Sequence, residues 1–223
     1  MYQARRLDNV AQVTHRIPLH YAAGPDEAAD RPAHVRAGSG LAWIGSRLAV
    51  VQDDTHIVAL VDPATGVVDH LHLPADAEGR RVFEPARGNK KAKHDLESAF
   101  SWRDGGVWHL LALGSGSTPA RDVVVHATWE DPEAEATSLR VVGVPRLFRW
   151  LAAQAEFAGS EMNLEGAALL GDRVRLFQRG NGAPTAELVP VDATGEISLP
   201  ALLALVDDPV GAPLPTLEQV RTY

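Results

Sequence analysis

Apolar residues in this chain gather in short runs, and three long stretches repeat the same order of runs. The stretches cover residues 39–62, 97–128 and 165–192. In each stretch a first run of small and apolar residues leads to a tight-turn signal, a second apolar run, a polar loop and a third run. Short runs rich in β-branched and aromatic residues between turn signals predict strands. Each stretch therefore predicts three antiparallel strands joined as a meander.

Glycine and aspartate mark the turn between the first and second run of every stretch. These residues tolerate the positive φ that short hairpin turns require. The turns are Gly45-Ser46-Arg47, Asp104-Gly105-Gly106 and Gly171-Asp172-Arg173. The third run of the last stretch is AELVPVD, residues 186–192. Residues 66–74 and 138–145 add a fourth predicted strand after the first two stretches.

Repeated four-stranded antiparallel units are typical of a β-propeller, which makes this an all-β chain. A β-sandwich with similar hairpins is the alternative, but the shared internal order of the three stretches favours the propeller. The stretches lie further apart than the ~40–50 residues of compact blades, so we expect inserts. Residues 144–157 and 198–208 have helical patterns and predict short helices that pack over one face.

The number of units does not fit a closed ring. About three and a half units fit in the chain, whereas propellers close with ~4–8 blades. An open ring would leave sheet edges unpaired. We therefore expect residues 1–223 to form a single β-propeller domain that is incomplete at the C-terminus, with residues 213–223 beginning another strand. Closure by a second subunit is the alternative.

Composition narrows the class of partner. The chain has 223 residues, of which 45% are apolar and 22% charged, and its net charge is −8. Nucleic acid is therefore excluded as the main partner, because binding the phosphate backbone needs a basic surface.

The absence of cysteine excludes disulfides, thiolate metal sites and a cysteine nucleophile. No apolar window has membrane-span length, and no signal-peptide pattern follows residues 1–6. We expect a soluble cytoplasmic protein with no membrane partner.

Three segments resemble a known group of proteins. They are NKKAKHDLES (residues 89–98), LALGSGSTPAR (111–121) and NLEGAALLGDRVRLFQRGNG (163–182). They are similar to a family of uncharacterised bacterial β-propeller proteins, which distantly resembles the esterase-like domain associated with phytase activity. The resemblance covers residues 38–208. It implies a six-bladed propeller, of which this chain covers part, and a hydrolase activity.

Alignment of the three stretches brings two glutamates into register. Glu97, Glu165 and Ser39 stand at the same place, directly before the first strand, and Asp95 and Asn163 lie two positions earlier. If the first strand is innermost, the two glutamates meet at one mouth of the channel. Converging carboxylates can bind a hard cation or divide acid and base roles. The alternative is that each glutamate caps its own sheet by accepting backbone N–H bonds.

The loops after the second strands should reach the same mouth. They carry Asp53 in the first stretch, Ser115, Ser117 and Arg121 in the second, and Arg179 and Asn181 in the third. Hydroxyls and exposed backbone N–H groups suit an anion, although the loop lacks the ending of a P-loop. A flexible connection is the plainer interpretation of this loop.

Three lysines precede Glu97: Lys90, Lys91 and Lys93. With the arginines they could hold a phosphate or a carboxylate. A solvated basic loop, or neutralisation of the inner carboxylates, is the alternative.

These residues suggest an enzyme that hydrolyses a phosphate or carboxylic ester on a small anionic substrate. Glu97 and Glu165 would be catalytic, and with Asp53 they could bind a divalent cation such as Ca²⁺. The lysines, serines, arginines and Asn181 would bind the anion. No G-x-S-x-G motif supports a serine esterase. The alternative is a non-catalytic propeller scaffold that binds a small molecule or a protein.

Overall fold

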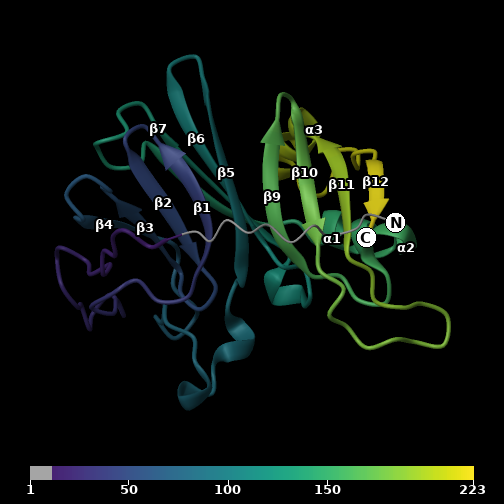
Figure 1. Cartoon of the computed structure of the whole chain (residues 1–223), viewed down its shortest axis with the longest axis horizontal. Helices are drawn as coiled ribbons and strands as arrows, with labels where there is room; N and C mark the ends of the chain where they lie inside the picture. Colours follow the sequence, from purple (N-terminus) through teal and green to yellow (C-terminus); the bar gives the residue numbers. More distant parts are fainter. Residues whose placement is uncertain (1–11) are drawn as a thin grey trace.

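The computed structural model describes residues 12–223, and these residues form three four-stranded antiparallel sheets. In each sheet the strands pair in the order in which they follow one another along the chain (Figure 1). The all-β prediction is therefore confirmed. Residues 1–6, on which the expected absence of a signal peptide depended, lie outside the described residues.

The first two sheets have the strands that the hydrophobic pattern predicts. The first consists of β1 (Gly38–Ile44), β2 (Arg47–Gln52), β3 (Ile57–Val61) and β4 (Val68–His72). The second consists of β5 (Leu96–Asp104), β6 (Val107–Gly114), β7 (Val123–Trp129) and β8 (Ser138–Gly143). The predicted turns also hold, since Gly45 and Gly105 have φ values of 60° and 54°, which favour glycine.

The third sheet differs from the prediction. It consists of β9 (Leu164–Leu170), β10 (Arg173–Gln178), β11 (Ala193–Ser198) and β12 (Glu218–Thr222). Residues 186–192, predicted as a strand, form an irregular loop in which Val189 is 64% exposed. The prediction was wrong because this run is apolar without being buried, and Pro190 in it lacks a backbone donor.

The third strand of this sheet is β11, which contains fewer apolar residues than residues 186–192, the segment predicted for that position. β11 buries Thr194 and Glu196, and the Glu196 carboxylate accepts a 3.0 Å hydrogen bond from Arg175 Nε on β10. The strand predicted within residues 213–223 is β12, which pairs with β11 and is the fourth strand of the third sheet. The described part of the chain thus holds three whole four-stranded units.

Short helices lie between the strands, and those over residues 144–157 and 198–208 were predicted. They are α1 (Pro145–Ala152), α2 (Ala155–Ala158) and α3 (Leu199–Asp207), with 3-10 helices η1 (Pro85–Arg87), η2 (Lys90–Ala92) and η3 (Pro119–Arg121). The helix expected over residues 144–157 is two helices, because Gln154 leaves helical geometry at ψ 88°. Within residues 12–223, no helix combines the length and apolarity needed to span a bilayer.

The first strands of the sheets lie side by side, and the sheets fan outward from them (Figure 1). One core lies between the first and second sheets and contains the fully buried Trp129. A second core joins the second and third sheets with the helices, and includes Phe148 and Phe157. The described strands do not close into a ring, so the β-propeller stays a prediction.

Candidate functional site

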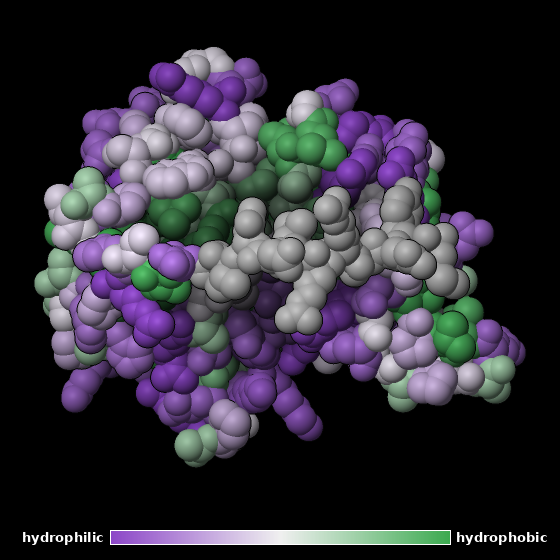
Figure 2. Space-filling model, viewed as in Figure 1, coloured by the Kyte–Doolittle hydropathy of each residue, from purple (hydrophilic) through white to green (hydrophobic). Residues whose placement is uncertain are grey.

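A polar cavity lies where β1, β5 and β9 begin, and we call it the mouth. Its volume is about 310 Å³. It is lined by Asp53, Lys90, Lys93, Asp95, Glu97, Ser117, Arg121, Glu161, Asn163, Glu165, Arg179 and Asn181. In Figure 2, hydrophilic atoms gather in the lower part of the central hollow and apolar atoms in its upper part. Charged groups of both signs are therefore concentrated at one end of the three inner strands.

A β-bulge at the start of each inner strand explains why these side chains meet. The pairing of β5 with β6 shifts between Leu96 and Ser98, which leaves Glu97 as the extra residue. The same shift leaves Glu165 unmatched on β9 and Ser39 unmatched on β1. Bulges re-aim a side chain at the rim of a sheet. The register inferred from sequence thus corresponds to one backbone irregularity repeated three times.

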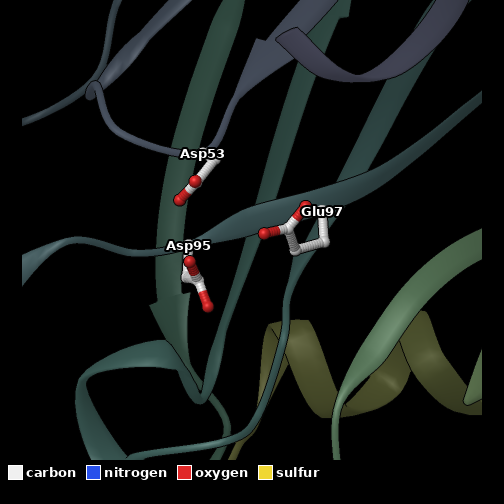
Figure 3. Close-up of side chains that lie close together, drawn as sticks. All are labelled: Asp53, Asp95 and Glu97. Atoms are coloured by element: carbon white, nitrogen blue, oxygen red, sulfur yellow. The ribbon is translucent and has the colours of Figure 1, made fainter. Parts of the chain in front are cut away.

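Three carboxylates converge at the mouth. Asp53 follows β2, Asp95 precedes β5 and Glu97 lies at the β5 bulge. One oxygen from each lies within 4.8 Å of the others, and Figure 3 shows the three groups around a common space. Like charges this close disfavour simultaneous ionisation.

Asp95 is held in a strained conformation. Its φ is 54°, a left-handed value that is uncommon for residues other than glycine. Ser115 holds it there, because the Ser115 N–H donates to the Asp95 carbonyl at 3.0 Å and the Ser115 hydroxyl donates to the carboxylate at 2.6 Å. Arg121 Nη1 lies 2.8 Å from the same carboxylate. Strained residues fixed by several contacts cluster at functional sites.

The Lys93 ammonium lies between two of the carboxylates. It forms ion pairs with Asp53 and Asp95, and Lys93 is only 4% exposed. Burial alone would lower the pKa of Lys93, but the two ion pairs outweigh it and raise the pKa. Lys93 therefore remains charged and neutralises this side of the mouth. The pKa of Asp53 is raised, first by burial and then by the adjacent Asp95.

Glu97 is the carboxylate left without a partner. Among residues 12–223, no side chain or backbone group forms a hydrogen bond or ion pair with its carboxylate. Burial and the negative charges of Asp53, Asp95 and Glu165 raise the pKa of Glu97 to about 7. A carboxyl with such a pKa exchanges protons near neutral pH, which is the property that general acid–base catalysis requires.

Glu165 lies opposite and is paired. Its carboxylate accepts from Arg179 Nη2 at 2.7 Å and from Asn163 Nδ2 at 2.7 Å. Asn181 lies beside Asn163 and Arg179. The two glutamates in sequence register therefore have different surroundings, one without a partner and one neutralised.

Most of the predicted site residues line the mouth, and two do not. Ser115 is fully buried behind it, against Asp95, and Lys91 borders a separate hollow with Thr118 and Pro119. The sequence-based set omitted Asp95, Asn163 and Glu161. Asp95 and Asn163 had a signal, since they align two positions before the glutamates. Glu161 aligns with Lys93, a residue of the opposite charge, so the register gave no signal for a glutamate there.

The predicted cation ligands Asp53, Glu97 and Glu165 fit the geometry in part. Asp53 and Glu97 belong to the close group of three carboxylates, but its third member is Asp95. Carboxylate oxygens suit a hard cation. A cation bound by both aspartates would have to displace the Lys93 ammonium.

We expect two stacked histidines, His56 and His94, to make the fold sensitive to acid. His94 lies between Lys93 and Asp95 along the chain and contacts His56. His56 is 2% exposed, and its ring centroid lies 3.7 Å from that of His94. Burial and His94 lower the pKa of His56 to about 3, from an ordinary value near 6.5. Its contribution to stability is therefore complete above about pH 6.5 and is lost as the pH falls, because the unfolded state binds the proton.

Through His56 alone, the free energy of unfolding should fall by about 2–3 kcal/mol between about pH 6.5 and pH 4.5. Urea unfolding of the wild type and of His56→Gln, which cannot titrate, measures this slope. A smaller pH slope is expected in the variant. Equal slopes in the two proteins would show that His56 is not the group responsible.

Comparison with known proteins identifies a family to which this chain is similar. A family described as a family of unknown function, DUF6929, matches residues 34–208, which is more than three quarters of the chain. No curated protein matches the sequence. The predicted resemblance to an uncharacterised family is confirmed, whereas its likeness to an esterase-like domain stays a prediction.

Proposed function

The chain belongs to this family of unknown function (DUF6929), and we propose that its mouth hydrolyses a small phosphate or carboxylic ester. The observation that supports this most strongly is Glu97, a carboxyl without a partner and with a pKa of about 7, facing a cavity of about 310 Å³. Groups of this kind in clefts are candidates for general acids.

Proton transfer is the role proposed for Glu97. In its neutral form it donates a proton to the ester oxygen as the bond from that oxygen to phosphorus or to the acyl carbon breaks. Water adds to the same phosphorus or carbon and loses a proton, which returns to the Glu97 carboxylate. The products are an alcohol and either a phosphate or a carboxylic acid, which releases its proton to solvent, and Glu97 ends in its original state.

The cations around Glu97 suit the anionic part of such a substrate. Arg121 and Arg179 both line the cavity. Arg121 Nη1 donates to the Ser117 hydroxyl at 2.6 Å, and the side chain of Arg179 is 54% exposed. Lys90 is exposed at the rim. Arginine forks bind phosphate and carboxylate oxygens with two parallel hydrogen bonds. We propose these three residues, with Ser117 and Asn181, as the anion site.

Cation binding without catalysis is a second candidate, favoured by the group of three carboxylates. A divalent cation there would relieve the repulsion that raises the pKa of Glu97. It would compete with the proton on Glu97 and with Lys93. Ca²⁺ should then raise the melting temperature more at about pH 8 than at about pH 6.

We also propose that the three sheets are blades of a β-propeller and that the mouth opens onto its channel. The side-by-side packing of β1, β5 and β9 supports this. On β1, Leu41 and Trp43 are 61% and 54% exposed, as expected of a face that a further blade would cover. An experimental structure of the natural gene product tests the proposal, and two sheets packed face to face would contradict it.

Hydrolysis is tested by assaying the purified chain with p-nitrophenyl phosphate and p-nitrophenyl acetate, with EDTA and with Ca²⁺. We expect turnover of one ester class above the buffer rate, fastest near or below neutral pH because Glu97 must carry a proton. No turnover with any substrate between about pH 5 and pH 8 would contradict the enzyme proposal. A Ca²⁺-induced rise in melting temperature alone would favour the non-catalytic alternative.

A further inference from the structure

A second cavity lies beside the mouth and has a different character. Its volume is about 440 Å³, within the usual range for small-molecule sites. The loop from Gly116 to Pro119 forms one wall, and one face of α1 forms the other through Pro145, Phe148 and Ala152. Ser117 borders both cavities, but the carboxylates of the mouth do not line this one.

Asp122 is the unusual feature of this cavity. It is 8% exposed and lines the cavity, yet within residues 12–223 its carboxylate has neither a hydrogen bond nor an ion pair. Burial raises the pKa of Asp122 to about 6, and Arg149 opposes that rise only in part. Buried charges are normally paired. The partner that Asp122 lacks in the described chain would be a cation from outside.

The second charge of the cavity is Arg149 at its rim. Arg149 is exposed, and its Nε donates to the carbonyl of Pro145 at 3.1 Å, which orients the side chain along α1. None of the described carboxylates forms an ion pair with its guanidinium. A ligand with a positive charge alone would be repelled by Arg149. A ligand with both charges would satisfy Arg149 and Asp122 together.

Apart from the two charges, most of the lining is apolar. Phe148, which is 1% exposed, and Pro119, Pro145 and Ala152 form its apolar part, and Ser117 and Thr118 are its neutral polar members. Gly116 has φ 69°, and a Cβ on it would meet the Phe148 ring and Met162, so the loop packs directly against α1. The cavity therefore has a well-packed apolar wall, with the Asp122 carboxyl in its lining and the Arg149 guanidinium at its rim.

From this arrangement we infer that the second cavity binds a small zwitterion with an apolar body, of which an apolar α-amino acid is the simplest. The ammonium group pairs with Asp122, the carboxylate pairs with Arg149, and the apolar side chain lies against Phe148 and the prolines. The inference stands independently of hydrolysis at the mouth, because no residue proposed for proton transfer lines this cavity.

Calorimetric titration with L-leucine tests the inference, with leucine amide and N-acetyl-leucine as probes that lack one charge each. We expect leucine to bind with a Kd of about 1 mM or tighter and each analogue about tenfold or more weakly. Asp122→Asn and Arg149→Gln should each weaken leucine binding by a similar factor. Asp104→Asn and Arg103→Gln are the matched controls, since both residues are exposed and Arg103 Nε likewise donates to a backbone carbonyl.

A second measurement does not depend on whether the variants fold. The Asp122 carboxyl, followed by carbon-13 NMR, should titrate near pH 6 in the free protein and at lower pH with leucine bound. Absence of leucine binding, equal affinity for leucine and leucine amide, or an Asp122 titration that leucine does not change would each overturn the inference. The ester assay at the mouth is unaffected by any of these results.

Discussion

Replacing Glu97 with glutamine is expected to lower kcat for the ester substrate by about 10²–10⁴-fold, the usual contribution of a positioned general acid. Glutamine has nearly the same shape but cannot donate the proton that the leaving oxygen needs. The substrate still meets Arg121 and Arg179, so KM should change little. Steady-state kinetics of the two proteins, with whichever ester the wild type hydrolyses, measures the effect.

The matched control is Glu130→Gln, an exposed glutamate just after β7 and outside the mouth, which should retain wild-type kcat. In the wild type, kcat/KM should fall as the pH rises above about 7, because Glu97 of the free protein loses its proton there. The Glu97→Gln variant should lack that pH dependence. If it kept wild-type kcat, or if both proteins had the same pH profile, Glu97 would not be the acid.

Replacing Lys93 with methionine should lower the free energy of unfolding by about 3–5 kcal/mol, the range for breaking a buried ion pair at one partner. Lys93 is buried and pairs with two aspartates, so its loss leaves Asp53 and Asp95 facing each other with Arg121 as the remaining ion-pair partner. Methionine keeps the apolar stem and removes only the charge. Urea unfolding near neutral pH measures the difference.

Lys91→Met provides the control, since Lys91 is exposed two residues earlier and should change stability by less than about 0.5 kcal/mol. The double variant Lys93→Met, Asp53→Asn should recover part of the loss, because it removes one of the two charges left without the ammonium. If Lys93→Met were as stable as Lys91→Met, the proposed role of Lys93 as the neutralising charge of the mouth would be wrong.

The strands of the first two sheets were predictable because their hydrophobic pattern and their burial agree. The runs VWHLLAL and DVVVHAT become β6 and β7, whose central residues are buried. The third sheet was not fully predictable. The apolar residues Leu188 and Val189 are exposed in a loop, whereas β11 buries Thr194 and Glu196 by pairing the carboxylate with Arg175. Hydrophobicity alone cannot identify a strand whose buried polar residues form hydrogen bonds or ion pairs with the neighbouring strand.

The sequence predicted which residues come together at the mouth, but not which of them form ion pairs and hydrogen bonds with one another. The register of Ser39, Glu97 and Glu165 in sequence corresponds to three equivalent bulges. Sequence could not show that Lys93 would neutralise Asp53 while Glu97 stayed without a partner, because that depends on side-chain geometry within a few ångströms. It also gave no signal for Asp122, whose partnerless state depends on α1 packing against the loop that carries Ser117.

The proposed catalysis depends most on the ionisation of Glu97, and carbon-13 NMR titration of its carboxyl measures this without a substrate. Asp53→Asn serves as a reference, since removing that negative charge should lower the pKa of Glu97. The account predicts that Glu97 titrates at about 7 in the wild type and lower in the variant. A wild-type value near the ordinary glutamate pKa of about 4.3, unchanged in the variant, would contradict it.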